Sequence, residues 1–166
     1  MKTVRVIVRE TTAFDVDDIC ALANDYYRYI ESKRSVFVGS VCELKSLKGR
    51  YLELIGQINP EIFTATDEDG KFLGYIIVSN VHEPKSLTSV PHARVEEIAV
   101  SQEARGSGVA KELIRHAIEW ARSKNLGVIQ VTLWEGSEEA MKLFSGLDFV
   151  SIQRKLEKKI DLPDPD

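Results

Sequence analysis

The stretch Ile98–Leu113, IAVSQEARGSGVAKEL, decides the fold prediction because a strand, a glycine-containing loop and a helix follow one another in it. Its apolar start ends a strand-like run, and from Val109 the apolar residues recur at helical spacing. Gly106 and Gly108 allow positive φ values and a close approach to the main chain. The first N–H groups of a helix lack partners within it, and the helix dipole favours negative charge there. The stretch therefore predicts a phosphate-binding site.

Two familiar phosphate-binding motifs do not match this stretch. The chain contains no GxxxxGKS or GxxxxGKT, so it has no P-loop. In a dinucleotide fingerprint, GxGxxG, the third glycine would stand where this chain has Lys111. What remains is Arg105-Gly106-Ser107-Gly108-Val109-Ala110, with the pattern R-x-x-G-x-A.

Outward from this stretch, hydrophobic periodicity, glycines and prolines predict the remaining elements. A β-α-β unit follows a hairpin-rich first half, which favours one mixed α/β or α+β sheet. Residues 31–43 are ambiguous, and residues 82–92 form a long polar connection. We expect strands over 4–10, 61–66, 71–80, 93–100, 128–134 and 150–156, and helices over 15–30, 44–55, 109–125 and 137–147.

The length, composition and net charge of the chain exclude several classes of protein. The 166 residues predict one domain over 1–160, followed by a frayed acidic tail at 161–166. Hydrophobic residues make up 43% of the chain, which disfavours disorder. The net charge of −4 disfavours a general nucleic-acid-binding surface.

The cysteines and the N-terminus predict a cytoplasmic protein. Cys20 and Cys42 form no CxxC motif and fit free buried thiols. The first ten residues, MKTVRVIVRE, lack the apolar run of a signal peptide, and no apolar run is long enough to span a membrane.

Motif, context and element order together resemble the GCN5-related N-acetyltransferase (GNAT) family over nearly the whole chain. The acetyl-CoA signature of that family is Arg or Gln, any two residues, Gly, any residue, then Gly or Ala, which Arg105–Ala110 matches. Residues 96–100 and 140–149 stand where other blocks typical of the family stand. The resemblance implies a mixed central sheet of six to seven strands flanked by four helices, with strands 4 and 5 splayed apart. It also implies acetyl-CoA as co-substrate and no metal.

The resemblance further implies where acetyl-CoA is held. Pantetheine is expected to lie like an added strand along Ile98, Ala99 and Val100, where the two strands part. The N–H near Ile98 is expected to polarise the thioester carbonyl. The N–H groups expected beneath the pyrophosphate are those of Arg105, Gly106, Ser107, Gly108, Val109 and Ala110.

An amine acceptor needs a base, because an amine with a lysine-like pKa of about 10.4 is almost entirely protonated at pH 7. Glu96 and Glu97 match the position of the base in the family. Adjacent strand residues face opposite sides, so at most one of them faces the cleft unless a bulge intervenes. We favour Glu96, with Glu97 next. The alternative is that one carboxylate is solvated and the other forms a structural salt bridge.

The acid step departs from the family, which often supplies a tyrosine where this chain has Phe144. Water, or a residue such as Tyr27 or Tyr75, would then protonate the leaving thiolate, unless it leaves unassisted. Ser137 and Asp148 also stand where the family often has Asn and Gly.

Other side chains have weaker claims to a function. His82 and His92 could act as a base, although loop histidines are usually solvated. Trp120 and Trp134 are expected in the core. Four tyrosines either line an acceptor cleft between the first two helices or divide between core and surface: Tyr26, Tyr27, Tyr29 and Tyr51.

Together with these residues, the resemblance implies direct acetyl transfer from acetyl-CoA to a primary amine in a ternary complex. The amine is a small molecule, a peptide N-terminus or a protein lysine. The alternative, favoured by Phe144, is a non-catalytic acyl-CoA-binding or sensing module. A third hypothesis is an interaction domain without a CoA site. A homodimer through an exposed strand edge or the C-terminal strand is also possible by analogy.

Overall fold

The computed structural model describes residues 5–33, 44–82, 90–156, 158 and 160. Several predicted features therefore lie outside the described residues. They are the start of the first strand at Val4, the ambiguous residues 34–43 with Cys42, residues 83–89 of the polar connection, and the tail 161–166.

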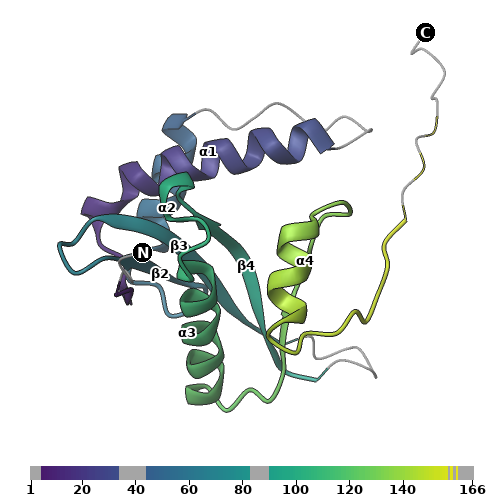
Figure 1. Ribbon diagram of the computed structural model, residues 1–166. Coiled ribbons are helices and arrows are strands. Elements are labelled where there is room, and N and C mark those ends of the chain that lie inside the picture. The colour runs from purple at the N-terminus through teal and green to yellow at the C-terminus, as the bar shows by residue number, and fades with distance from the viewer. Residues whose placement is uncertain (1–4, 34–43, 83–89, 157, 159, 161–166) are drawn as a thin grey trace, which may run out of the picture.

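The centre of the molecule is one mixed sheet with the order β1-β2-β3-β4-β5 (Figure 1). The first three pairings are antiparallel, and β4 and β5 are parallel. This arrangement confirms the predicted mixed sheet. The strands are β1 Ile7–Glu10, β2 Glu61–Thr66, β3 Phe72–Val81, β4 His92–Val100 and β5 Ile129–Val131.

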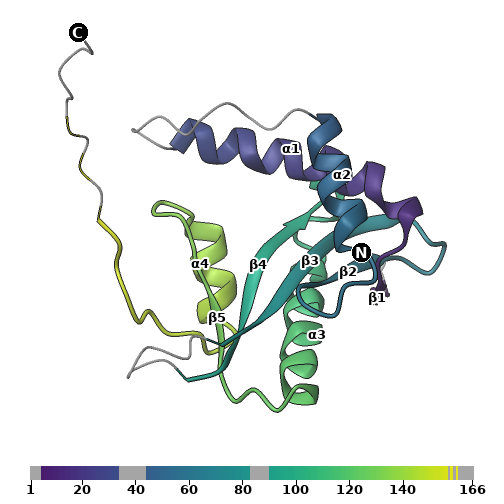
Figure 2. The same cartoon turned by 180° about the vertical axis from the view of Figure 1, so that it is seen from behind.

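Helices cover both faces of the sheet (Figures 1 and 2). On one face lie α1 and α2, and on the other lies α3, which connects β4 to β5. In both views, α4 stands at the β5 end of the sheet. The helices are α1 Val16–Lys33, α2 Leu44–Leu54, α3 Val109–Ser123 and α4 Glu138–Ser145, with short 3-10 turns at Ala13–Asp15 and Gln102–Ala104.

Two apolar clusters form the core, one on each face of the sheet. Leu113 and Trp120 of α3 pack with Val95 of β4 in the first cluster. Ile19 of α1 packs with Ile77 of β3 in the second. The period of two in the strands and the helical period in α1 and α3 direct these side chains to opposite faces.

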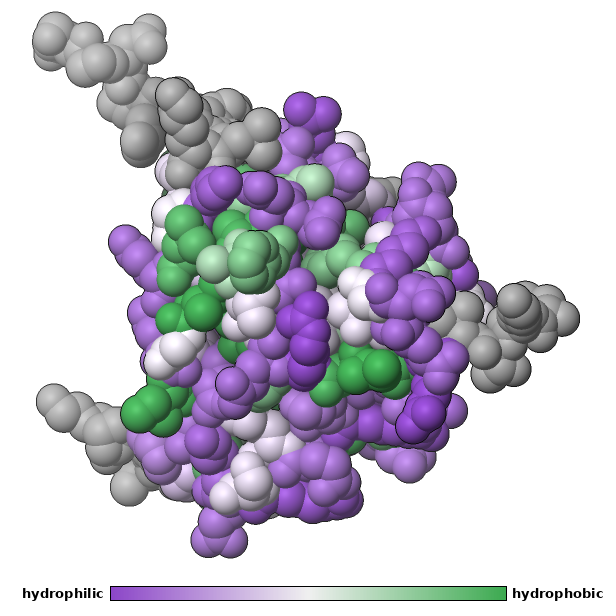
Figure 3. All heavy atoms as spheres, turned by 90° about the vertical axis from the view of Figure 1, so that its left-hand side faces the viewer, coloured by the Kyte–Doolittle hydropathy of each residue, from purple (hydrophilic) through white to green (hydrophobic). Residues whose placement is uncertain are grey.

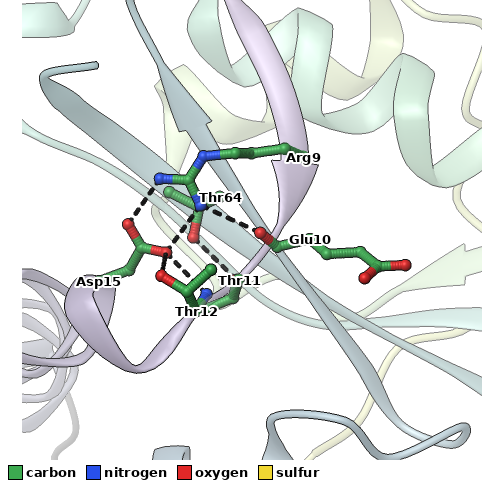
Figure 4. A network of polar contacts seen from close by, with 6 residues as sticks. All are labelled: Arg9, Glu10, Thr11, Thr12, Asp15 and Thr64. Atoms are coloured by element: carbon green, nitrogen blue, oxygen red, sulfur yellow. Dashed lines mark hydrogen bonds and ion pairs between the residues drawn. The ribbon is translucent and has the colours of Figure 1, made fainter.

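A polar network fixes the entry into α1 (Figure 4). The Arg9 guanidinium donates to both carboxylate oxygens of Asp15, at 2.8 Å each. The main-chain N–H of Thr12 also donates to Asp15, at 2.8 Å. Burial would raise the pKa of the Asp15 carboxyl, but the hydrogen bonds from Arg9 and Thr12 outweigh burial and lower this pKa. The pair Thr11 and Thr64 joins the same corner to β2 through a hydroxyl contact of 2.8 Å.

Two strand predictions need correction. In the described residues the sheet has five strands, not six to seven, because residues 150–156 are in no strand. Their alternation is typical of a strand, but a strand forms only beside a pairing edge, and this segment leaves the body of the molecule after α4. The fifth strand is also shorter than predicted, since its pairing with β4 stops at Val131.

The surface on the left side of Figure 1 is shown in Figure 3. Hydrophilic side chains cover most of it, and apolar side chains appear there only in separate patches. Among the helices that the structure describes, none combines the length and apolar character needed to cross a membrane.

Candidate active site

The loop between β4 and α3 has the backbone that the glycine spacing predicts. Gly106 and Gly108 have φ values of 75° and 87°, in the left-handed region that glycine tolerates best. Gly108 caps the N-terminus of α3, whose first main-chain bond runs from the Glu112 N–H to the Gly108 carbonyl. Residues 105–108 are exposed, and the first-turn N–H groups of α3 have no partner within the helix. The loop can therefore accept a phosphate group.

A free main-chain edge leads into this loop. Strand β5 pairs with β4 only from Ala93 to Val95, so β4 has no strand partner on that side over Glu96–Val100 in the described chain. The Ser101 N–H donates to the Leu73 carbonyl of β3. Main-chain groups alternate in direction along a strand, so those of Ala99 also face β3, and those of Ile98 and Val100 face the free edge. The predicted splay is present.

A β-bulge brings the two adjacent carboxylates to one face of the sheet. Ile77 lies opposite Glu97 and Val78 lies opposite Val95, which leaves Glu96 as the extra residue of β4. The Ser79 hydroxyl donates to the Glu96 carboxylate. Since Ser79 and Ile77 alternate with Val78, both glutamates lie on the side of α1 and α2.

The two carboxylates have different surroundings. Glu96 is exposed, and Glu97 is 7% exposed. Oε1 of Glu97 accepts a hydrogen bond from Tyr27, at 3.0 Å, and lies 2.6 Å from Nη2 of Arg50. Oε2 of Glu97 accepts from Tyr51 at 2.8 Å and from Tyr75 at 2.9 Å. The buried carboxylate is therefore compensated by one cation and three hydroxyls.

The three tyrosines keep their protons in this cluster. Burial and the charge of Glu97 raise the pKa of Tyr27 to about 12. The same two causes raise the pKa values of Tyr51 and Tyr75. Each hydroxyl is thus a donor throughout the physiological pH range.

The geometry leaves the two carboxylates with different capacity to accept a further hydrogen bond. The four donors around Glu97 occupy its oxygens, so a substrate proton has no open lone pair there. Glu96 has one hydroxyl partner and an exposed carboxylate on the same face, next to the free edge at Ile98. The structure thus brings together an exposed carboxylate, an open main-chain edge and a glycine-containing loop at a helix N-terminus.

A comparison with family models shows to which family the chain belongs. The model for the acetyltransferase (GNAT) family matches residues 16–149. The chain belongs to the GNAT acetyltransferase family. The match covers α1 through α4, including the loop and both glutamates.

Solved structures with the same fold include other acetyltransferases. A variant of the BH1408 protein from Bacillus halodurans has a TM-score of 0.81 and 16% identity, over 93% of this chain and 99% of that one. The aminoglycoside N-acetyltransferase AAC(6')-Iy in complex with CoA has a TM-score of 0.74 and 18% identity, over 96% and 97%. A ribosomal-protein-alanine N-acetyltransferase from Brucella melitensis has a TM-score of 0.69 and 18% identity, over 94% and 99%. At these identities the likeness concerns the fold.

The GNAT fold here has no hydroxyl at the α4 position of the usual acid. Phe144 is buried, with its ring 5.0 Å from that of Phe149. Tyr75 is fully buried and donates to Glu97. The hydroxyl of Tyr27 also donates to Glu97, and its pKa of about 12 lies far above that of an ordinary thiol, about 8.5. Neither tyrosine is therefore suited to protonate a thiolate.

Of the two further departures from the GNAT pattern, the one at Asp148 has a structural account and the one at Ser137 has none. Asp148 has a φ of 64°, a conformation that explains why glycine is usual there and that Asp tolerates better than most residues. Ser137 stands at the N-cap of α4 without a side-chain capping bond.

Several secondary expectations change. His82 is exposed, as expected, but His92 is buried, with Nδ1 2.9 Å from the Val90 carbonyl. Trp120 is in the core, but Trp134 is partly exposed, and it forms a side-chain hydrogen bond with Tyr26. That bond joins α1 to the segment after β5, across the region where the strands part.

Arg50 is the residue that sequence reasoning missed. It precedes Tyr51 on α2, and no local motif links it to Glu97, 47 positions away. A buried carboxylate in a strand requires a compensating charge, which is the one signal that could have prompted a search for a cation. Within the described residues, no three His, Cys, Asp or Glu side chains are grouped to hold a metal ion.

Proposed function

We propose that this protein is an N-acetyltransferase that moves the acetyl group of acetyl-CoA directly to a primary amine in a ternary complex. The observation that carries the proposal is the continuity of three features along Glu96–Ala110. They are an exposed carboxylate, an unpaired main-chain edge and a glycine-built loop at a helix N-terminus. Family membership makes acetyl transfer the reaction class to test.

The loop and the edge supply the binding groups for acetyl-CoA, which brings the activated acetyl group. The N–H groups of Arg105 and Ser107 donate to the carbonyls of Gln102 and Ala104, so those left for the pyrophosphate are the N–H groups of Gly106, Gly108, Val109 and Ala110. The dipole of α3 adds about 0.3–1 kcal/mol per charge. The pantetheine amides pair with the free groups of Ile98 and Val100, as an added strand would. Both parts use main chain that is open at the surface.

The acetyl carbonyl is placed at the start of the free edge. The N–H of Ile98 points to that edge and is the donor available to stabilise the carbonyl oxygen as it becomes negative. The amine nitrogen then forms a bond with the carbonyl carbon, and the carbon–sulfur bond breaks.

Glu96 accepts a proton from the ammonium form of the acceptor, which frees the lone pair of the amine nitrogen for attack. Its exposed carboxylate accepts this proton and returns it to solvent, while Ser79 holds the side chain by one hydrogen bond. After the attack, the nitrogen loses a second proton, and water provides one for the thiolate. The thiolate leaves without a side-chain acid, because its conjugate acid has a pKa of only about 8.5.

Glu97 acts through its neighbours. It joins Tyr27 of α1, Arg50 of α2 and Tyr75 of β3 to β4, and so fixes these three elements next to Glu96. We assign it a positioning role.

The experiment is turnover with acetyl-CoA and a panel of primary amines, followed by detection of the released CoA thiol. We expect turnover of at least one amine, with kcat about 10²–10⁴-fold lower in Glu96→Gln. Glu119→Gln is the matched control, since Glu119 is exposed at the far end of α3 and pairs with Arg122. Its kcat should stay at the wild-type value.

Phe144 favours one second candidate, a non-catalytic acyl-CoA-binding or sensing module. That candidate predicts CoA binding without turnover of any amine. Where slow hydrolysis of acetyl-CoA is seen, it also predicts the same rate in Glu96→Gln as in the wild type. Turnover that depends on Glu96 would exclude it.

A further inference from the structure

A hydrogen bond crosses the opening between the two strands that part. It joins the side chains of Tyr26 in α1 and Trp134, which follows β5. An indole N–H can only donate, so the hydroxyl oxygen of Tyr26 is the acceptor. In Figures 1 and 2, the segment that leads from β5 into α4 faces the C-terminal half of α1. The bond therefore links α1 to the far side of the opening.

Trp134 stands near the part of the free β4 edge where Ile98 lies. Val131 is the last residue of β5 that pairs with β4, and it lies opposite Val95. The turn into α4 begins after Trp134, so the same count of residues along two parallel strands brings Trp134 near Ile98. Val131 packs in the cluster on the α3 face. By alternation Trp134 points to the opposite face, where α1 lies.

Two further contacts continue this link to β4. The rings of Tyr26 and Tyr27 have their centroids 5.9 Å apart. Tyr27 donates to Glu97, the neighbour of Ile98 in β4, at 3.0 Å. Burial and the charge of Glu97 raise the pKa of the Tyr26 hydroxyl, which places this hydroxyl near the same carboxylate. Tyr26, Tyr27 and Trp134 thus form an aromatic bridge from β4 to the segment after β5.

The side chains of the aromatic bridge hold one another in place. Tyr27 is held at its hydroxyl by Glu97, and Tyr26 and Trp134 are held by their mutual hydrogen bond. Tyrosine and tryptophan have two rotatable side-chain bonds, so fixing them costs little conformational entropy. Tyr26 is partly buried and Trp134 is 38% exposed, so the bridge lies at the surface. A group placed between the parted strands would therefore meet aromatic rings on the side of α1.

The position of the bridge bears on the acyl group that CoA carries. In the proposed function, on which this inference rests, the Ile98 N–H meets the thioester carbonyl and pantetheine continues toward Val100. The carbons beyond the carbonyl then extend in the other direction, under the bridge. The amine has a separate approach, because Ser79 lies opposite Arg94 and draws the Glu96 carboxylate toward the start of β4. We propose that the aromatic bridge closes the acyl end of the site, so that it takes acetyl and rejects longer straight acyl chains.

The test is the affinity of the full-length protein for CoA, acetyl-CoA and hexanoyl-CoA, measured by calorimetric titration. We expect CoA and acetyl-CoA to bind. Hexanoyl-CoA should bind at least about 10-fold more weakly than acetyl-CoA, because its additional carbons have to displace the bridge. These are binding measurements, so they do not depend on turnover of an amine.

Two variants open the bridge in different ways, and circular dichroism checks that each is folded. Trp134→Ala removes the outer ring, so the additional carbons of hexanoyl-CoA can be buried, which favours binding. We expect this variant to bind hexanoyl-CoA at least as tightly as acetyl-CoA. Tyr26→Phe keeps the ring but removes the acceptor of the indole N–H, and it should reduce the preference for acetyl-CoA by about 3-fold. Phe14→Ala is the matched control, because Phe14 is 96% exposed just before α1, and it should keep the wild-type preference.

The outcomes separate the role of the bridge from the acyl-CoA site itself. Equal affinity of the wild type for acetyl-CoA and hexanoyl-CoA, with both bound, would overturn the role of the bridge and leave the proposed function standing. An unchanged preference in folded Trp134→Ala and Tyr26→Phe would do the same. Binding of none of the three ligands would overturn the proposed function and the role of the bridge together.

Discussion

The phosphate loop and the Glu97 cluster lie close together along one stretch of chain, but they are built in opposite ways. The loop is exposed main chain whose shape depends on the positive φ values of Gly106 and Gly108. The cluster is made of side chains, with Arg50 and three tyrosines from three other elements around the buried carboxylate of Glu97. The difference separates main-chain groups that are open at the surface from side chains that satisfy one another around a buried charge.

If the loop binds through its main chain, filling it should abolish binding without affecting the fold. Gly108→Trp places an indole over the first turn of α3, and we expect acetyl-CoA affinity to fall by at least about 1,000-fold, or about 4 kcal/mol. The measurement is the rise in melting temperature caused by acetyl-CoA, which should disappear in this variant.

Gly56→Trp is the matched control. Gly56 also has a positive φ, of 80°, and an added Cβ there meets nothing within 4 Å, but it lies beyond the end of α2. The backbone strain is therefore similar in the two variants. A loss of the acetyl-CoA effect in both would contradict a specific role for the loop.

Mutation of the Glu97 cluster should lower the stability of the folded protein. Glu97→Ala leaves Arg50, the buried hydroxyls of Tyr51 and Tyr75 and the half-buried hydroxyl of Tyr27 without their acceptor. We expect the free energy of unfolding to fall by about 3 kcal/mol. Denaturant unfolding measures this change. Glu96→Ala, one residue away and exposed, should change stability by less than about 0.5 kcal/mol. Equal effects at the two positions would remove the distinction between them.

The Arg9 and Asp15 network gives a smaller effect with a known pH dependence. We expect Asp15→Asn to lower the free energy of unfolding by about 1–2 kcal/mol at pH 7. The folded-state pKa of Asp15 is lowered, so its stabilisation is present above its unfolded pKa of about 3.9 and is lost as pH falls below that value. Unfolding of both proteins from pH 7 to pH 2.5 should show their difference shrinking. A constant difference would contradict the ion pair as its source.

The smallest effect concerns the proton of Tyr27. Burial and Glu97 raise its pKa to about 12, so Glu97→Gln should lower this pKa by removing the charge. The raised pKa stabilises the fold below the unfolded value of about 10, and this contribution is lost as pH rises through about 12. Phenolate absorbance during an alkaline titration measures both proteins, with Tyr27→Phe identifying the signal. An unchanged titration in Glu97→Gln would contradict the electrostatic account.

Local main-chain features could be predicted from the sequence. Gly106 and Gly108 marked the loop because few other residues adopt their conformation, and the periodicity of α3 marked the helix that follows. The splay was expected only from the family resemblance, since no property of a single strand indicates how far its neighbour pairs.

Features that depend on distant residues could not be predicted. A bulge places Glu96 and Glu97 on one face, and its position depends on the register between β3 and β4. Glu97 is surrounded by Arg50, Tyr27 and Tyr75 because α1 and α2 cross the sheet at this point, and no single stretch of sequence indicates that crossing. The strand predicted over 150–156 is wrong, because the alternation of a segment does not indicate whether a sheet edge is there to pair with it.

The most direct test of the central claim is a calorimetric titration of the wild-type protein with acetyl-CoA and with CoA. The claim is that the free edge of β4 and the loop before α3 form one acyl-CoA site. We expect both ligands to bind at one site per chain, with dissociation constants in the micromolar range or tighter. The absence of binding by either ligand at about 1 mM, which corresponds to less than about 4 kcal/mol of binding free energy, would contradict it.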